Sequence, residues 1–337
     1  KMLKSVFNYI NYIFFFKDFN INKKINILES LDNVNTKEKI KNLRKYGAYL
    51  AGLIEGDGTF AIKDENKIYK NNYNPHIIVV FKFSDMKVAE FLCSLTRCGT
   101  VSKYKDRNYV LWKISTIKDV YIIVSIINGY MRTPKHETLY RYQSYFNKYL
   151  EGINKDNLKI TILDKDKSPI ESNSWAAGFI DADGNFSISI TKRKNGKARI
   201  ITRFSIEQRV TYHRNEDSYE NNSYFFIINS LAQAFNGSIY SRSRIINEKN
   251  FSSFQIITFT NSRNIKVIDY FCKFPLWSSK YIDYMSWKKI VCHQNTIGKI
   301  TDENIIKIAI ESRKDFNKTR ITFNWKHLEQ RILFLKN

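Results

Sequence analysis

Residues 49–60 read YLAGLIEGDGTF, and residues 175–186 repeat the same pattern as WAAGFIDADGNF. Each copy runs from small or apolar residues to an acid, a small residue, an aspartate, a glycine, one polar residue and a phenylalanine. The aspartates of the two Asp-Gly pairs are Asp57 and Asp183. A long pattern that occurs twice indicates a duplicated domain, so the sequence predicts two similar halves built around these segments.

Small residues lie at helical spacing in both copies. Gly52 and Gly56 are four positions apart and therefore share one helical face, and Gly178 and Ala182 occupy the same places in the second copy. Small residues at this spacing let two helix backbones approach closely. We therefore expect the two repeat helices to pack against each other and to bring the two aspartates together at their C-terminal ends.

Strands and helices follow each copy in the same order. After the first copy, periodicity predicts strands at 59–63 and 76–83, a helix at 85–95, a hairpin at 99–105 and 109–115, and helices at 117–128 and 135–150. After the second, it predicts strands at 185–192 and 199–206, a helix at 224–235, a hairpin at 237–244 and 251–260, and further helices. The repeated order of one helix, two strands, one helix and two strands predicts an α+β fold with two antiparallel sheets.

The repeat divides the chain into five segments. We expect a leader or partly unstructured segment at 1–44, a first half at 45–150, a linker at 151–173, a second half at 174–300, and a C-terminal helix and tail at 301–337.

The chain is strongly basic. Its 337 residues carry 55 Lys and Arg against 32 Asp and Glu, a net charge of +23. This excess favours a polyanionic partner, because each neutralised phosphate releases counterions. Charge alone also fits a ribosomal or a membrane-surface protein. No apolar run approaches the roughly 18 residues of a membrane span, so we expect no membrane partner.

Two carboxylates at adjoining helix C-termini are electrostatically unfavourable. Each opposes the helix dipole by about 0.3–1 kcal/mol, and the two repel each other. Bound divalent cations would remove both problems, and oxygen-only ligands with open positions suit Mg²⁺ or Mn²⁺. Metal ions that bridge attacking and leaving oxygens catalyse phosphodiester hydrolysis. The alternative is a core helix that ends in an ordinary Asp-Gly turn, but two copies in matched contexts argue against it.

Both segments resemble the LAGLIDADG signature. Over residues 46–290 the chain is similar to the two-motif, monomeric LAGLIDADG homing endonucleases that introns encode. This resemblance implies a pseudo-symmetric, duplicated αββαββα fold whose two four-stranded antiparallel sheets form a saddle for double-stranded DNA. It also implies a single chain that cleaves DNA at a specific site.

The resemblance assigns the metal site to the end of each motif. It implies that Asp57 and Asp183 are catalytic and bind Mg²⁺ or Mn²⁺. The backbone carbonyls of Gly56 and Ala182 would share in coordination.

Further site residues follow from the resemblance alone. Glu55 and Asp181, the earlier acids, would have structural roles at the helix junction, whereas Lys135 and Lys280 would act beside the metal site. A solvated or phosphate-contacting lysine is the alternative.

The end of the second strand in each half differs between the halves. The resemblance gives Gln208 a catalytic supporting role in the second half, and Asp85 takes that place in the first. This difference predicts unequal activity on the two DNA strands.

The polar strand faces would present DNA-contacting side chains, because a β-surface can enter the major groove and read base edges. A merely solvated strand face is the alternative for each of them. Strand alternation nominates Lys63, Lys82, Lys103, Lys105, Lys113, Asn185, Ser187, Ser189, Arg199, Arg203, Arg242 and Arg244.

Two functions fit these features. The first is a site-specific, metal-dependent DNA endonuclease that makes a double-strand break at an intron insertion site. The second is an RNA maturase that binds host intron RNA and assists its splicing, with or without nuclease activity. The presence of both motif acids favours the nuclease. The chain is rich in Ile, Asn, Lys, Phe and Tyr, whose codons are AT-rich, which together with the resemblance indicates a mitochondrial origin.

Overall fold

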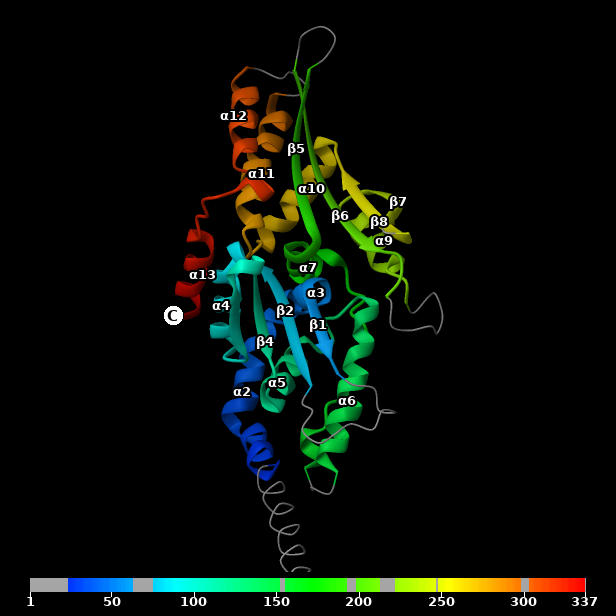
Figure 1. Cartoon of the computed structure of the whole chain (residues 1–337), viewed down its shortest axis with the longest axis vertical. Helices are drawn as coiled ribbons and strands as arrows, with labels where there is room; N and C mark the ends of the chain where they lie inside the picture. Colours follow the sequence, from blue (N-terminus) through cyan, green and yellow to red (C-terminus); the bar gives the residue numbers. More distant parts are fainter. Residues whose placement is uncertain are drawn as a thin grey trace, which may run out of the picture.

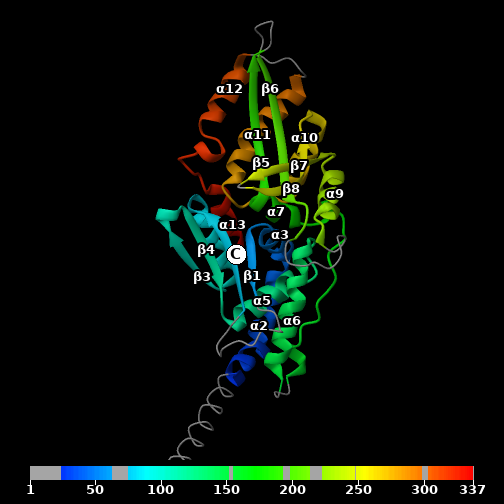
Figure 2. The ribbon, with the colours of Figure 1, turned by 45° about the vertical axis from the view of Figure 1, so that its right-hand side comes forward.

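Two halves lie one above the other along the long axis of the molecule, each with its own four-stranded antiparallel sheet (Figure 1). The computed structural model describes residues 24–62, 75–151, 155–192, 198–212, 222–246, 248–297 and 303–336. Figure 2 shows the two sheets on either side of the central helices α3 and α7. The α+β class and the two antiparallel sheets are as the sequence predicts.

The first half contains one helix before each pair of strands and two helices after them. Its elements are α3 (Gly47–Asp57), β1 (Gly58–Ala61), β2 (His76–Lys82), α4 (Met86–Thr96), β3 (Thr100–Tyr104), β4 (Tyr109–Ile114), α5 (Ile117–Ile127) and α6 (Glu137–Leu150). The strand order in its sheet is β1-β2-β4-β3.

The second half repeats this order with longer strands. Its elements are α7 (Trp175–Asp183), β5 (Gly184–Lys192), β6 (Ala198–Arg209), α9 (Phe225–Ala234), β7 (Ser238–Ile246), β8 (Lys249–Thr258), α10 (Asn261–Lys273) and α11 (Lys280–Ile297). The strand order β5-β6-β8-β7 matches that of the first sheet. The αββαββα order therefore occurs twice.

Helices flank the two halves. Residues 24–32 and α2 (Val34–Leu43) are helical, and Leu28 and Leu31 are fully buried, so this part of the expected leader packs into the core. Two helices, α12 (Glu303–Lys314) and α13 (Lys326–Lys336), follow the second half where one helix and a tail were expected. Within the described ranges, no helix has the length and apolar character needed to cross a bilayer.

Glycines allow α3 and α7 to pack backbone to backbone at the centre of the molecule. A Cβ atom added at Gly52 would lie 2.0 Å from the carbonyl oxygen of Trp175, and one added at Gly178 would lie 2.0 Å from that of Tyr49. Real Cβ atoms do not approach so closely, so only glycine fits at either position. The predicted pairing of the two repeat helices is confirmed.

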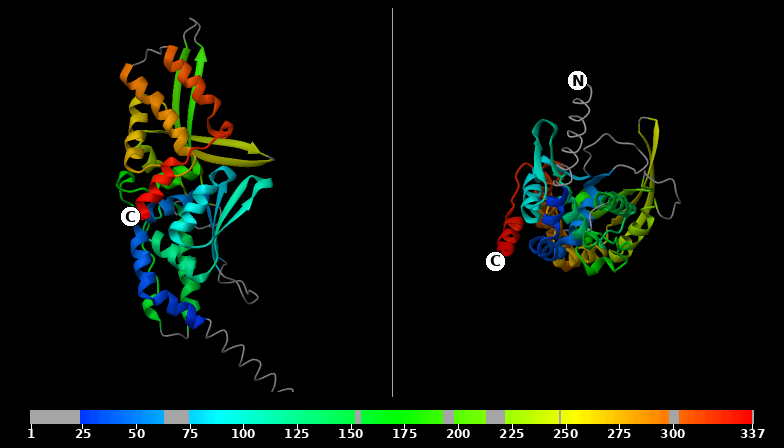
Figure 3. Two further views of the ribbon diagram at one scale, coloured as in Figure 1. Left: turned by 90° about the vertical axis from the view of Figure 1, so that its left-hand side faces the viewer. Right: turned by 90° about the horizontal axis from the view of Figure 1, so that it is seen from below.

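Alternation in the strands gives each sheet a covered and an open face. In β2, Ile77, Val79 and Phe81 are buried beneath the helices, whereas Val80 and Lys82 are exposed. The hairpins β3–β4 and β7–β8 project on the same side of the helix pair, with a gap between them (Figure 3, right). We call the open faces of the two sheets the concave face.

Candidate active site

Asp57 and Asp183 end the two central helices and line one cleft. The cleft has a volume of about 490 Å³, and Lys135 and Gln208 also line it. Burial, and then the negative charge of Asp183, raise the pKa of Asp57 to about 6. Burial likewise raises the pKa of Asp183. The helix pair therefore brings the two aspartates close enough to interact, as the sequence predicts.

A lysine caps the C-terminal end of each central helix, and Lys135 is buried whereas Lys280 is half-buried. The Nζ atom of Lys135 donates to the carbonyl oxygens of Glu55 at 2.6 Å and Gly58 at 2.8 Å. Lys280 Nζ donates to the carbonyl oxygen of Ala182 at 2.6 Å. Burial lowers the pKa of Lys135 to about 8 and also lowers that of Lys280. Each cation lies at the negative end of a helix dipole, which stabilises both the cation and the helix end.

The carboxylate of Glu55 is fully occupied by hydrogen-bond partners from two parts of the chain, residues 132–133 and Trp175. Its carboxylate accepts hydrogen bonds from the backbone N–H of Arg132 at 3.0 Å and of Thr133 at 2.6 Å. It also accepts bonds from the hydroxyl of Thr133 and the indole N–H of Trp175, each at 2.6 Å. Burial raises its pKa. These contacts leave Glu55 tied to the helix junction, in keeping with a structural role.

Asp181 has the equivalent environment in the second half. It accepts hydrogen bonds from the hydroxyl of Tyr49 and the backbone N–H of Trp277, each at 2.7 Å, and from the hydroxyl of Ser278. Burial raises the pKa of this carboxyl as well.

Gln208 contacts the motif aspartate of its own half. Its side-chain amide donates to Oδ2 of Asp183. This bond orients the carboxylate and favours its ionised form, which partly offsets the effect of burial on the pKa of Asp183.

Asp85 does not occupy the matching place, so that prediction is wrong. Gly58 pairs with Val79 in the first sheet and Gly184 pairs with Ile206 in the second. Val79 and Ile206 are therefore equivalent positions, and Gln208 lies two residues after Ile206. The equivalent residue two positions after Val79 is Phe81, which is buried and apolar.

Asp85 instead joins the two halves. Its carboxylate accepts hydrogen bonds from the backbone N–H of Ser279 at 2.7 Å and from the hydroxyl of Ser279 at 3.1 Å. Ser279 directly precedes Lys280 and helix α11, so this contact fixes the start of that helix from the opposite half. The two halves therefore do differ beside the motif aspartates, as the sequence indicates, but the residue that replaces Gln208 in the first half is Phe81 and not Asp85.

Oxygen atoms at the two helix ends fit a hard divalent cation. The carboxylates of Asp57 and Asp183 and the nearby carbonyls of Gly56 and Ala182 are the available donors. Each carbonyl has a second lone pair beyond any bond to a lysine. In the described ranges, no three His, Cys, Asp or Glu residues are grouped so that they could hold a metal. A metal here would keep water or take phosphate oxygens, which is typical of Mg²⁺ and Mn²⁺.

Strand register places most of the nominated DNA-contacting residues on the concave face. In the first sheet, Lys113 pairs with Ile78, on the same face as Lys82, and Lys105 lies in the exposed turn after β3. In the second sheet the residues on this face are Asn185, Ser187, Ser189, Arg199, Arg203, Arg242 and Arg244. Lys63 lies outside the described residues.

Lys103 is a correction to this set. It pairs with Val110, which is fully buried under the helices, so its side chain points to the covered side of the sheet. There it forms a 2.7 Å salt bridge with Glu90 of α4. The alternation of β3 was assigned one residue out of step.

Sequence reasoning missed several residues of the cleft. Arg209, Tyr212 and Tyr224 line it together with the aspartates. The alternation that nominated Arg203 reaches Arg209 three steps later and could have found it. The two tyrosines come together through an isolated bridge between Thr211 and Ser223, which no sequence signal indicates.

Comparisons with known proteins agree with this architecture. The sequence profile of the LAGLIDADG endonuclease family matches residues 50–150 and 176–291. The chain is 42% identical over 310 residues to the intron-encoded DNA endonuclease aI3 of Saccharomyces cerevisiae. The aligned region covers 87% of this chain and 74% of that protein. It is 28% identical over 253 residues to an uncharacterized cox1 intron-2 protein of Schizosaccharomyces pombe, covering 74% of this chain and 67% of that protein.

A more distant relative is the intron-encoded RNA maturase bI4 of Saccharomyces cerevisiae, 26% identical over 64% of this chain and 30% of that protein. Among solved structures, the meganuclease I-SmaMI bound to DNA superposes with a TM-score of 0.61 at 19% identity, covering 82% of this chain and 98% of that one. The endonuclease I-GzeII in complex with its DNA target gives 0.60 at 17% identity, covering 82% and 99%. The chain therefore belongs to the LAGLIDADG endonuclease family and carries both motifs of that family in one polypeptide.

Proposed function

We propose that the chain is a metal-dependent DNA endonuclease that makes a double-strand break at an intron insertion site. The observation that carries this proposal is the meeting of Asp57 and Asp183 in one cleft, with a lysine at the end of each central helix. One chain supplies both halves of this site, so the active species is a monomer on double-stranded DNA.

The proposed chemistry depends on the groups at the helix ends. Bound Mg²⁺ or Mn²⁺ would supply charge neutralisation at the phosphate and acidify water. Asp57 and Asp183 would hold the metal, with the carbonyls of Gly56 and Ala182 as additional ligands. Ionised carboxylates are required for this task, and the raised pKa of Asp57 means that metal and proton compete for the same oxygens.

The two lysines would act as catalytic supporting residues from fixed positions. Lys135 and Lys280 are each tied to the end of a central helix by carbonyl oxygens, so their charges cannot swing away from the cleft. A cation held at this place favours negative charge that develops on a phosphate group. Gln208 would keep the carboxylate of Asp183 in its binding orientation.

The DNA duplex would lie along the concave face. Arginine side chains there, such as Arg199 and Arg203, are exposed and can contact guanine or phosphate. Arg242 and Arg244 both contact Glu207, which holds them on the strand surface before DNA arrives. Lys82, Lys105, Lys113, Asn185, Ser187 and Ser189 complete this proposed contact set.

Cleavage of junction DNA tests the proposal. Duplexes that span intron insertion sites of candidate host genes are incubated with the protein and Mg²⁺, and then with EDTA. We expect a double-strand break at one junction that requires the metal and disappears with EDTA. Intact DNA at every junction, with a folded protein, would contradict the proposal.

An RNA maturase is the second candidate function. The similarity to the maturase bI4 favours it, and the motif acids do not exclude it. A splicing assay on the host intron with and without the protein decides this point. Both functions suit a protein encoded by a mitochondrial intron, an origin that the resemblance to a cox1 intron protein supports.

A further inference from the structure

Two adjoining cavities lie on the helical side of the molecule. This side carries α2 and α13 and is turned away from the projecting hairpins of both sheets (Figure 3, left). One cavity has a volume of about 560 Å³ and the other of about 440 Å³. Tyr46, the residue directly before α3, lines both of them, so the two cavities adjoin at its ring.

The larger cavity is a basic groove. Four cations, Lys39, Lys45, Arg97 and Lys118, line it. None of the described lining residues of either cavity is acidic. Lys39 is held across the groove, because its Nζ atom donates to the carbonyl oxygen of Arg97 at 3.4 Å. A groove with this many cations and no lining carboxylate repels cations and attracts a polyanion.

Amide and hydroxyl groups lie between these cations. Asn35, Thr36 and Asn42 line the same groove. Thr36 is buried and its hydroxyl donates to the carbonyl of Ser30, whereas Asn35 and Asn42 are exposed and can both donate and accept hydrogen bonds, as a ribose 2′-hydroxyl does.

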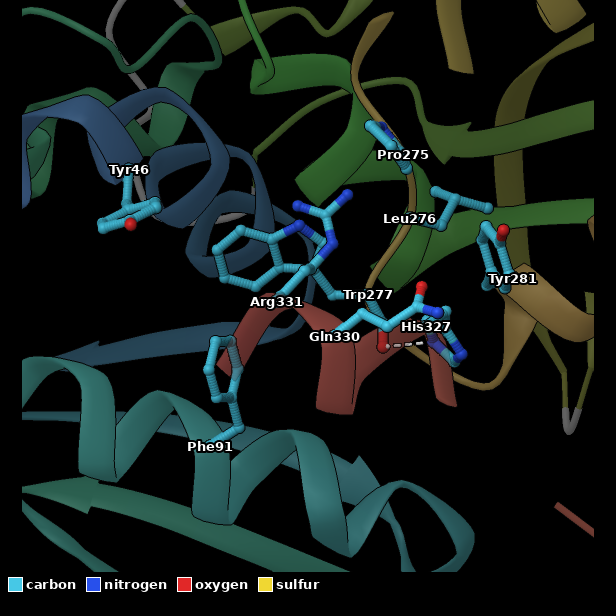
Figure 4. A pocket seen from close by; sticks show the side chains of 9 residues that line it. All are labelled: Tyr46, Phe91, Pro275, Leu276, Trp277, Tyr281, His327, Gln330 and Arg331. Carbon is cyan, nitrogen blue, oxygen red and sulfur yellow. Dashed lines mark hydrogen bonds between the residues drawn. The ribbon is translucent and has the colours of Figure 1, made fainter. Parts of the chain in front are cut away.

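The smaller cavity is an aromatic pocket between the two halves. Trp277 lies at its centre, with the ring of Phe91 at 5.5 Å and that of Tyr46 at 6.0 Å between centroids (Figure 4). The guanidinium of Arg331, from α13, lies 5.4 Å from the ring of Trp277. Gln330 lines the pocket and is exposed to solvent.

This pocket is rigid on its inner side. Trp277 stacks on Tyr49 with ring centroids 3.8 Å apart, and its carbonyl contacts Nε2 of His327 at 3.1 Å. His327 in turn stacks on Tyr281 at 4.3 Å. The pocket walls are therefore held in place before any ligand arrives, and Tyr46, Gln330 and Arg331 remain to contact it.

We propose that the basic groove and the aromatic pocket together bind a segment of single-stranded RNA. One unpaired base enters the aromatic pocket, where Tyr46 and the guanidinium plane of Arg331 provide stacking surfaces and Gln330 meets the base edge. The flanking phosphates lie along the cations of the basic groove. This site goes beyond DNA cleavage and is separate from the concave face, and it would serve the maturase candidate.

Binding of a short labelled oligouridylate, measured by fluorescence anisotropy in EDTA, tests the site. Lys45→Gln with Arg97→Asn removes two groove charges, and asparagine suits the left-handed backbone of Arg97 at φ 48. We expect the slope of log affinity against log salt to shrink by about 1.4, since each phosphate contact on a single strand contributes roughly 0.7. Tyr46→Leu should weaken binding roughly 5- to 150-fold through lost stacking.

A matched charge change on the concave face is the control. Lys113→Gln with Arg203→Asn removes the same number of cations from the two sheets. This variant should lose affinity for duplex DNA and keep its affinity for the oligouridylate. Asp57→Asn should also keep it, so a failure of the nuclease assignment leaves this measurement intact.

Three results would overturn the proposal. The first is displacement of the oligouridylate by duplex DNA in proportion to DNA bound, which would place the RNA on the concave face. The second is equal binding of an oligodeoxythymidylate, which would remove the assignment to RNA. If Tyr46→Leu does not fold, the unmodified protein is instead cross-linked to an RNA that contains 4-thiouridine. The third result that would overturn the proposal is a set of cross-links confined to the two sheets.

Discussion

The indole of Trp175, the first residue of α7, donates a 2.6 Å hydrogen bond to Glu55 near the end of α3. In the opposite direction, the hydroxyl of Tyr49, near the start of α3, donates a 2.7 Å hydrogen bond to Asp181 of α7. The aromatic residue at the beginning of each motif helix is thus bonded to the first acid of the other motif. These crossed pairs, with the two glycines between them, set the distance between the two motif aspartates, Asp57 and Asp183.

Removal of one crossed hydrogen bond should destabilise the protein without harming catalysis. Tyr49→Phe keeps the ring that stacks on Trp277 but leaves Asp181 one donor short. We expect a loss of about 1–3 kcal/mol in the free energy of unfolding, measured by urea denaturation. Tyr104→Phe, at a partly exposed ring, is the control and should change it by less than about 0.5 kcal/mol. An equal loss of unfolding free energy in both variants would show that the hydrogen bond from Tyr49 to Asp181 does not stabilise the fold.

A methyl group between the central helices should be harmful. In an exposed helix, Gly→Ala stabilises by about 1 kcal/mol. Gly52→Ala should do the opposite, because its Cβ would meet the carbonyl of Trp175 at 2.0 Å. We expect a loss of roughly 1–3 kcal/mol in unfolding free energy and a slower nuclease. A more stable protein would show that the two helices can separate freely.

Each motif aspartate should be essential for cleavage and dispensable for DNA binding. Asp57→Asn and Asp183→Asn keep the side-chain volume but remove the negative charge that we propose holds the metal. We expect the cleavage rate to fall about 10³-fold or more, equivalent to about 4 kcal/mol of activation free energy. Gel-shift affinity for the duplex should change little. Full cutting by either variant would refute the metal-site assignment.

The raised pKa of Asp57 predicts a pH dependence with a definite sign. The folded-state pKa is about 6 and the ordinary value is 3.8, so the folded protein binds the proton more tightly than the unfolded chain. This carboxyl therefore contributes stability at low pH that is lost as pH rises from about 4 to about 6. In the absence of metal, the Asp57→Asn variant should lack this contribution to the fall in stability between about pH 4 and pH 6. Measurement of Tm as a function of pH for both proteins tests this.

Metal binding should show the reverse trend. A cation displaces the proton from Asp57, so stabilisation by Mg²⁺ should be larger near pH 7.5 than near pH 5. The change in Tm on addition of Mg²⁺ measures it, and Asp57→Asn serves as the control. A shift that is equal at both pH values would contradict the competition between metal and proton.

The two DNA strands should be cut at different rates. Gln208 supports Asp183 in one half, whereas buried Phe81 takes its place in the other. With each strand end-labelled separately, we expect a nicked intermediate. Gln208→Leu should slow cleavage of one strand about 10- to 100-fold and leave the other strand as the internal control. Simultaneous cutting in the native protein would contradict the proposed effect of Phe81.

Much of this architecture could be predicted from the sequence, because the repeated motif combines helix spacing, small residues and paired acids. The helix pair follows from this motif, and the repeated order of helices and strands follows from periodicity. The structural roles of Glu55 and Asp181 were implied by the resemblance to the family. Asp85 was misplaced because matching the halves by sequence interval ignores strand register, which counts from the residue paired with Gly58. Lys103 was misplaced for a related reason, since a shift of one residue moves a strand side chain to the other face.

Other features had no sequence signal at all. The contact of Asp85 with Ser279 joins residues that are far apart in the chain, and so does the salt bridge of Lys87 with Glu329 at 3.5 Å. The pocket around Trp277 exists because α13, which follows the second half, packs beside α4 of the first half (Figure 4). Such contacts depend on the assembled fold and not on local periodicity.

The crossed pairs also bear on domain exchange among related proteins. A hybrid that joined residues 45–150 of this chain to the second half of a relative would present Tyr49 and Glu55 to new partners. If that second half lacked an acid at the place of Asp181, the buried hydroxyl of Tyr49 would lose its acceptor. If it lacked an N–H donor at the place of Trp175, the buried carboxylate of Glu55 would lose one of its donors. Compatibility of exchanged halves is therefore decided by four side chains at the helix junction, which lie apart from the concave face.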